Sequence, residues 1–276
     1  MSLGVKYMLI ATFSFALMNA SVKYLSGFHV AQIILIRSLV SAIICIYGIR
    51  KLKLKPFGIN KKYLIIRGAF GFLALVLYFF TLHKLTLASA VTLVYLSPIF
   101  TAIVGVFMLN EKIKAFQWFF FMMAFAGVGI LYGFDIQGDP IWVVFGVLSA
   151  ILAAVAYVAV RKVKETDHPY VVVFYFPLIA VPFTAVWSYF EWENPDFYQW
   201  LILIAIGLFT QIGQYYMAKA LQSERAEKMV AMKYIGVIYA LFFGYLLFDE
   251  TPSIYTILGI LLVAGGVILN IRIKHT

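Results

Sequence analysis

The chain has 276 residues, of which 64% are hydrophobic and only 12% are charged, and its mean hydropathy is +0.95. A soluble protein of this length could not keep so much apolar surface out of water. Apolar runs of about 18 residues or more recur along the chain, each long enough to cross a bilayer. The short alternating strands of a membrane barrel are not evident. The sequence therefore predicts an all-α integral membrane protein.

Ten membrane spans are predicted, joined by short connections. In chain order they cover residues 4–23, 30–49, 63–82, 86–109, 115–133, 141–160, 170–190, 199–219, 228–248 and 254–271. We expect the first to be a true span, because no small-residue cleavage pattern ends a short apolar core. The single cysteine, Cys45, lies in the second span and excludes an internal disulfide.

Basic residues are distributed unevenly between the two sides of these spans. Seventeen fall on the side of the N-terminus: Lys6, Arg50, Lys51, Lys53, Lys55, Lys61, Lys62, Arg67, Lys112, Lys114, Arg161, Lys162, Lys164, Arg225, Lys228, Arg272 and Lys274. The other side has two, Lys23 and Lys84. The positive-inside rule then predicts that both termini are cytoplasmic. The basic stretch at 50–62 is interpreted as an orientation signal near anionic lipid, not as a nucleic-acid site.

One sequence pattern recurs 139 residues apart, in "YLSPIFTAIVGVFMLNEK" and "YIGVIYALFFGYLLFDET". The shift superposes Tyr95 on Tyr234, Glu111 on Glu250 and Gly127 on Gly266. A unit of five spans, an odd number, ends on the opposite side of the membrane from where it began, so a second copy has inverted topology. Inverted repeats are typical of alternating-access transporters. We therefore expect residues 1–135 and 136–276 to form two five-helix units of one transport unit.

Longer segments resemble a known family. "LASAVTLVYLSPIFTAIVGVFMLNEKI" with "AGVGILY", and later "GYLLFDETPSIYTILGILLVAGGVIL", resemble the EamA-type domain of the drug/metabolite transporter superfamily. "IRSLVSA" and "RGAFGFLALVLYFFTLHKLTLASA" resemble the branch that includes S-adenosylmethionine and organic-anion carriers. The resemblance implies ten helices in two inverted repeats around a central cavity, lined mainly by the third, fourth, eighth and ninth helices. It leaves the substrate open, since such proteins carry amino acids, drugs, vitamins and other metabolites.

Two basic residues within spans are candidates for substrate binding. Arg37 lies about 10 Å into the second span, where a charged group usually faces a cavity or a partner. Its guanidinium suits a carboxylate or phosphate, although bonding to loop carbonyls is an alternative role. Lys233 has Val94 as its repeat mate, so its charge breaks the internal symmetry, which a polar substrate would explain. Snorkelling to the cytoplasmic interface is the alternative for Lys233.

Uncharged polar and aromatic residues complete the predicted binding site. Gln211, Gln214 and Tyr215 have the spacing of one polar stripe, which should face the cavity or another helix. Asn19 pairs with Lys23 at i, i+4 in the first span. The remaining candidates are tyrosines within spans, although most membrane tyrosines are packing residues. They are Tyr78, Tyr95, Tyr157, Tyr175 and Tyr234.

Five residues are candidates for gating or for positions at helix ends. Glu111 and Glu250 close spans at opposite faces, and Pro98 interrupts the backbone ladder of the fourth span. Lys219 ends the eighth span near the cytoplasm, where snorkelling is the simpler role. Glu227 could meet Lys233 or carry a proton, and a surface pair with neighbouring basic residues is the alternative.

The sequence predicts a secondary transporter and no enzyme. No acid lies in the middle third of any predicted span, which disfavours a buried proton relay. Metal-ligand spacing and nucleotide motifs are absent, so neither a metal nor another cofactor is predicted. The predicted cargo is a small organic metabolite with a carboxylate or other anionic group, moved by alternating access through the cell membrane by a monomer or homodimer. The alternatives are a proton-coupled exporter of amino acids, S-adenosylmethionine-like zwitterions or drugs, a membrane-embedded lipid-modifying enzyme, and a non-transporting scaffold.

Overall fold

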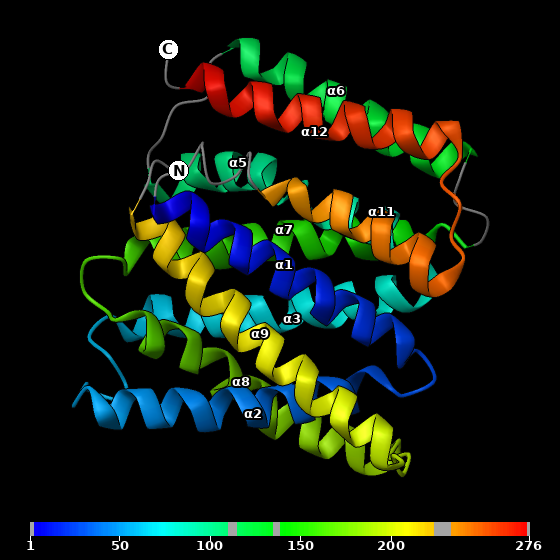
Figure 1. Cartoon of the computed structure of the whole chain (residues 1–276). Coiled ribbons are helices and arrows are strands. Elements are labelled where there is room, and N and C mark those ends of the chain that lie inside the picture. The colour runs from blue at the N-terminus through cyan, green and yellow to red at the C-terminus, as the bar shows by residue number, and fades with distance from the viewer. Residues whose placement is uncertain (1–2, 110–114, 135–138, 224–232, 275–276) are drawn as a thin grey trace.

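A computed structural model describes residues 3–109, 115–134, 139–223 and 233–274, and within these ranges the regular elements are all helices (Figure 1). The first half of the chain contains α1 (Leu3–Tyr24), α2 (Val30–Lys51), α3 (Lys61–Lys84), α4 (Leu87–Val94), α5 (Ser97–Leu109) and α6 (Ala115–Phe134). The second half contains α7 (Ile141–Lys162), α8 (Pro169–Phe190), α9 (Phe197–Ser223), α11 (Ile235–Phe248) and α12 (Ile254–Lys274). Each predicted span contains helix, and the predicted all-α class is confirmed.

Seven stretches in the described ranges are long and apolar enough to cross a membrane. They are Leu3–Tyr24, Val30–Lys51, Lys61–Lys84, Leu87–Met108, Ile141–Lys162, Pro169–Phe190 and Phe197–Met217. The outward faces of the helices carry large apolar side chains, such as Ile43, Phe107 and Phe183, each more than half exposed. Such a surface would be a liability in water and suits contact with lipid.

The predicted span at 86–109 contains two helices, with Pro98 at the interruption of the backbone ladder. α4 ends at Val94 with Tyr95 as its C-cap, and α5 begins at Ser97. Pro98, the second residue of α5, lacks the N–H that would bond the Val94 carbonyl, and its ring crowds that carbonyl. The backbone therefore turns at Tyr95 and Leu96.

Histidines begin two equivalent helices in the two halves. The backbone N–H of Ala31 donates to His29 Nδ1 at the start of α2, and the N–H of Tyr170 donates to His168 Nδ1 at the start of α8, both at 3.3 Å. These caps satisfy one of the N–H groups left unpaired at a helix start. The two histidines lie 139 residues apart, which is the spacing of the sequence repeat.

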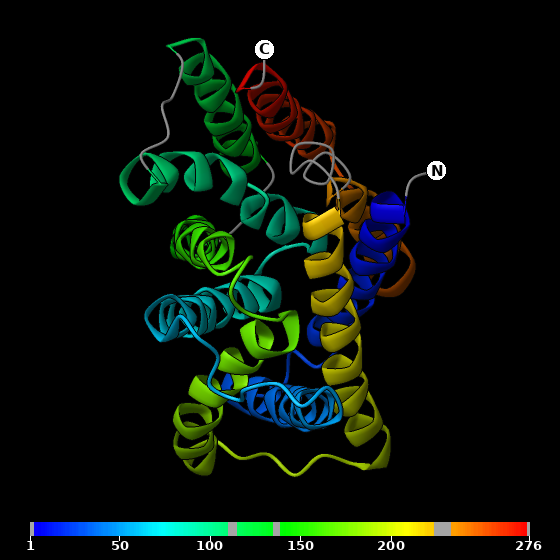
Figure 2. The same ribbon diagram turned by 90° about the vertical axis from the view of Figure 1, so that its left-hand side faces the viewer.

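The main helix pairs of one half have counterparts when the two halves are exchanged. The contact of α3 with α7 corresponds to that of α1 with α9. The contact of α2 with α9 corresponds to that of α8 with α3, and the contact of α5 with α7 to that of α11 with α1. α2 pairs with α8 at one edge of the bundle and α6 with α12 at the other (Figures 1 and 2). The contacts therefore join the two halves along the whole molecule.

Glycines allow α6 and α12 to touch backbone to backbone. A Cβ atom at Gly127 would lie 2.7 Å from the Gly259 carbonyl oxygen, and one at Gly266 would lie 2.6 Å from the Phe120 carbonyl oxygen. Neither distance is compatible with a side chain. Small residues are the usual means of close helix approach in membranes, where burial from water does not drive association.

Candidate substrate-binding cavity

An internal cavity of about 140 Å³ lies between the two halves. Its wall takes residues from α1, α2, α3, α4, α7, α8 and α9, together with Tyr95 and Lys233. A single water needs about 10–15 Å³ on the same measure, so the space is large enough for an organic molecule. Three cationic side chains line it, and no Asp or Glu of the described ranges does so. The chemistry of the cavity therefore depends on Arg37, Arg67 and Lys233.

Arg37 is 4% exposed and reaches the cavity from α2. Its Nε donates to Thr210 Oγ1 of α9 at 3.2 Å, and its guanidinium carbon lies 4.8 Å from the ring centre of Phe176. The aromatic face and the hydroxyl hold the guanidinium plane in place. Its Nη1 is buried without a hydrogen-bond partner in the described structure. Arg37 thus anchors to a neighbouring helix, not to loop carbonyls, and keeps a donor free.

Arg67 was not predicted as a cavity residue, because the sequence analysis grouped it with the cytoplasmic basic residues. Arg67 is 6% exposed and lines the cavity, about 9 Å along α3 from Lys61. Its Nη2 donates to Gln214 Oε1 at 3.4 Å, and its Nε is buried without a partner. Its position six residues inside an apolar helix is the sequence signal that could have identified it.

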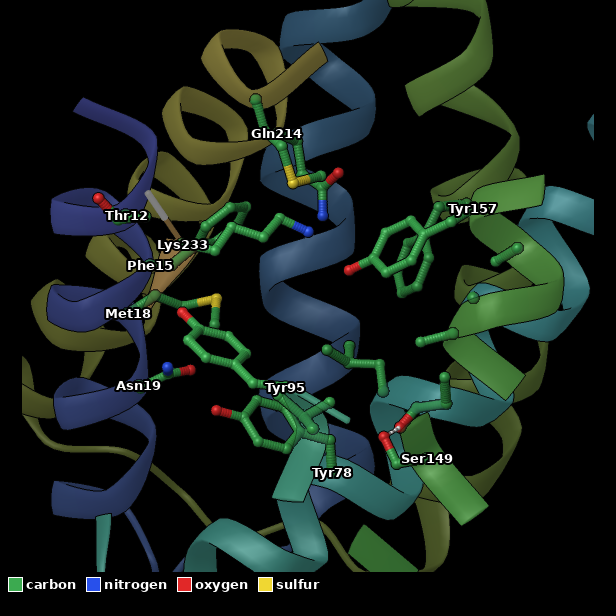
Figure 3. Close-up of a pocket in the computed structure, with 18 of the residues that line it drawn as sticks. Thr12, Phe15, Met18, Asn19, Tyr78, Tyr95, Ser149, Tyr157, Gln214 and Lys233 are labelled. Atoms are coloured by element: carbon green, nitrogen blue, oxygen red, sulfur yellow. Dashed lines mark hydrogen bonds between the residues drawn. The ribbon is translucent and has the colours of Figure 1, made fainter. Parts of the chain in front are cut away.

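Lys233 faces the cavity at the residue before Tyr234, the N-cap of α11. Its Nζ lies 4.5 Å from the ring centre of Tyr157 on α7, close enough for a cation–π contact. Figure 3 shows Lys233 and Tyr157 extending into the same space from opposite walls, with Gln214 beside them. The ammonium group therefore lies at the cavity wall.

The two repeat-related tyrosines contact each other at the cavity floor. Tyr234 Oη donates to the Tyr95 carbonyl oxygen at 2.7 Å, and the ring centres are 5.4 Å apart in an edge-to-face arrangement. The bond satisfies a carbonyl that the break after α4 leaves unpaired. Tyr95 lines the cavity, while Tyr234 is buried behind it. Tyr78 and Asn19 also line the wall, as Figure 3 shows.

Three other predicted binding residues lie outside the wall. Gln211 accepts a hydrogen bond from Ser41 Oγ at 2.6 Å and holds α9 to α2. Tyr215 stacks on Tyr170 with ring centres 5.2 Å apart. Tyr175 donates to the Phe57 carbonyl oxygen at 3.0 Å. Of the predicted polar stripe, only Gln214 is therefore a cavity residue.

Glu250 forms a polar cluster at the end of the bundle opposite the start of α1. Its Oε1 lies 2.6 Å from Lys23 Nζ, and its Oε2 accepts from the backbone N–H of Leu87 at 2.8 Å. Lys23 Nζ also donates to the Leu85 carbonyl oxygen at 2.5 Å. We call Lys23, Leu85, Leu87 and Glu250 the polar latch. It joins α1 and the start of α4, in the first half, to the segment after α11 in the second.

The other candidate gating residues have separate positions. Pro98 lies just after the break between α4 and α5. Lys219 Nζ lies 4.7 Å from the ring centre of Tyr215 on α9, outside the cavity wall. Glu111 and Glu227 fall outside the described residues.

Apolar membrane-crossing helices around a cavity that contains cationic side chains define a multi-pass membrane carrier. The chain belongs to the EamA-like transporter family, whose pattern matches residues 2–133 and 140–272. A pseudopaline exporter, CntI, of Pseudomonas aeruginosa is 31% identical over 277 residues, covering 98% of this chain and 96% of the relative. Solute carrier family 35 member G1 of Mus musculus is 28% identical over 280 residues, covering 95% and 76%. A solved crystal structure shares the fold, with a TM-score of 0.66, 18% identity and 95% of each chain covered.

Proposed function

We propose that this transporter moves a small organic metabolite that carries a carboxylate or another anionic group. The observation that supports this most is the cavity itself, whose described wall holds three cations and no acid. Uncompensated charge in a membrane interior is costly, so such residues usually serve a ligand or an ion path. An anionic substrate would supply the missing counter-charge and accept the free guanidinium hydrogens.

We infer that transport proceeds by alternating access between two inverted five-helix units, residues 1–135 and 136–276. Corresponding helix pairs make contacts in the two halves, and this supports the division. The position of the cavity between the halves supports it as well. The polar latch would hold one end closed while the other opens. α1 begins and α12 ends at the same end of the bundle as the basic loop between α2 and α3, which supports cytoplasmic termini (Figure 1).

The relatives support carriage of a solute, and none of their activities requires chemical conversion. One is an exporter and another is a solute carrier, so the lipid-modifying enzyme is set aside. The zwitterion alternative differs from our proposal in the charge of the ligand. An anionic group is the strongest partner for a substrate amine, and the described wall offers none.

A thermal-shift screen of the purified protein against a metabolite panel tests the proposal, because ligands that bind only the folded state raise its melting temperature. The panel should contain carboxylates, their neutral amides and amines of matched size. We expect the stabilising compounds to be mainly carboxylates. Stabilisation confined to neutral or cationic compounds would overturn the proposal.

Uptake of a stabilising carboxylate into proteoliposomes then tests the two predicted anchors. Arg37→Ala and Lys233→Ala should each lower uptake by at least about tenfold, since losing one charge-assisted contact costs roughly 1.5–3 kcal/mol. Lys164→Gln is the matched control, because Lys164 is exposed in the loop after α7. Normal uptake by both alanine variants would contradict the assignment.

A further inference from the structure

Two buried guanidinium groups in the cavity have unused donors. Arg37 Nη1 and Arg67 Nε have no hydrogen-bond partner in the described structure, although both residues are more than nine-tenths buried. Each arginine makes one side-chain hydrogen bond within the described residues. Arg37 bonds Thr210 at 3.2 Å, and Arg67 bonds Gln214 at 3.4 Å. Buried donors without a protein partner are rare in folded proteins, so these atoms are candidates for binding a ligand.

The guanidinium groups of Arg37 and Arg67 line the same cavity. Both approach the same aromatic residue, Phe176. Arg37 lies over its ring. Arg67 Nη1 lies against Gly71, and a Cβ atom added at Gly71 would be 3.6 Å from the same ring. A single carboxylate, with two oxygens and about four lone-pair sites, could accept hydrogen bonds from both. The pair therefore forms one anion site.

Lys233 adds a third cation to the same cavity wall. It comes from the segment before α11, whereas the arginines come from α2 and α3, and its ammonium group contacts the Tyr157 ring. An aromatic face reduces the cost of burying an ammonium but leaves its N–H donors available. A ligand with one anionic group on the arginines would leave this charge uncompensated.

We propose, resting on the function above, that the substrate carries at least two separate anionic groups, one bound by Arg37 and Arg67 and another by Lys233. The chemical class that fits is a di- or tricarboxylate. A single phosphate can carry up to two negative charges on one centre, so a phosphate ester is the comparison ligand in the test.

Matched pairs of ligands test this inference on the purified full chain. Succinate, glutarate and adipate should each be compared with their own monoamide, which has the same size but one carboxylate fewer. Melting temperatures measured over a concentration series give the apparent affinities. We expect at least one diacid to bind about tenfold or more tightly than its monoamide, and more tightly than glycerol 3-phosphate.

Variants then assign the second anionic group. Lys233→Gln should lower the affinity for the diacid by about tenfold or more and remove most of its preference over the monoamide. Arg67→Gln should weaken both ligands, and the exposed control Lys164→Gln should behave as the wild type. The ligand pairs also test the inference in the wild type alone, so it remains falsifiable if a variant does not fold.

The outcomes separate this inference from the proposed function. Equal affinity for diacids and monoamides, or tighter binding of the phosphate ester, would overturn the two-group substrate but leave an anion carrier. A diacid preference that survives Lys233→Gln would overturn the role of Lys233. If no anion of the panel stabilises the protein, both proposals are wrong.

Discussion

Arg67 occupies its place in the cavity because residue 71, one turn along α3, is glycine. A Cβ atom at Gly71 would collide with Arg67 Nη1. That atom is the end of a flexible side chain, so it can move without disturbing the backbone. Adding a methyl group at residue 71 should therefore move the Arg67 guanidinium without unfolding α3.

Gly71→Ala should separate ligand binding from stability. Alanine favours a helix over glycine by about 1 kcal/mol, so the melting temperature without ligand should stay level or rise. The carboxylate-induced shift in melting temperature should shrink, because Arg67 is displaced. Gly129→Ala is the control, since no atom lies within 4 Å of a Cβ atom there. A full ligand response in Gly71→Ala would contradict the role of Arg67.

Some residue assignments could be made from sequence, and others depend on neighbours that sequence does not reveal. Arg37 and Lys233 were identifiable as charges inside apolar spans, and both line the cavity. Arg67 was missed because charge counting by side of the membrane treats the first turns of a helix as loop. Gln211 and Gln214 lie on nearby faces of α9, and only the placement of α2 decides that Gln211 bonds Ser41.

At the scale of elements, helix length and apolarity predicted where the helices lie. The third span was expected at 63–82 and α3 covers Lys61–Lys84. The break between α4 and α5 was not predicted, although Pro98 was identified as an interruption of the ladder. A proline within a membrane helix can kink it or end it, and the neighbouring helices decide which.

The contact between α6 and α12 gives a test of helix packing. Gly127→Ala would place a methyl group against the Gly259 carbonyl, and overpacking of this kind costs about 1–3 kcal/mol. We expect a lower melting temperature in detergent, measured by tryptophan fluorescence. Gly129→Ala, on the same helix, should not lower it. Equal melting temperatures for the two variants would show that the helices do not approach as closely as described.

The whole molecule is held at one end by the polar latch across the two halves. Both side chains of the Lys23–Glu250 pair are about 15% exposed, so the pair is partly shielded from water. Because Glu250 also accepts from the Leu87 N–H, its loss would leave a helix-start donor unpaired. The latch should therefore favour the conformation that is closed at this end, which we predict to be the outer end.

Glu250→Gln should open that end more often. Losing the charged contact costs on the order of 1–3 kcal/mol, which corresponds to about a tenfold or larger change in the closed-to-open ratio. An Ala153→Cys variant places a thiol on the cavity wall, and the native Cys45 is fully buried. We expect a membrane-impermeant thiol reagent added outside cells to label it about tenfold faster when Glu250→Gln is also present.

Glu191→Gln is the control for the labelling experiment, because Glu191 is an exposed carboxylate just after α8 at the same end of the bundle. It should leave the labelling rate unchanged. An unchanged rate in Glu250→Gln would mean that the latch does not control access. Faster labelling only from the cytoplasmic side would reverse the predicted orientation.

A ligand-bound structure tests the central claim most directly, namely that a cationic cavity between the two halves binds an anionic substrate. The purified protein should be solved with the most stabilising carboxylate of the screen. We predict a carboxylate within hydrogen-bond distance of Arg37 Nη1 and Arg67, with the ligand extending toward Lys233. A carboxylate bound elsewhere, with both guanidinium groups free of it, would contradict the account.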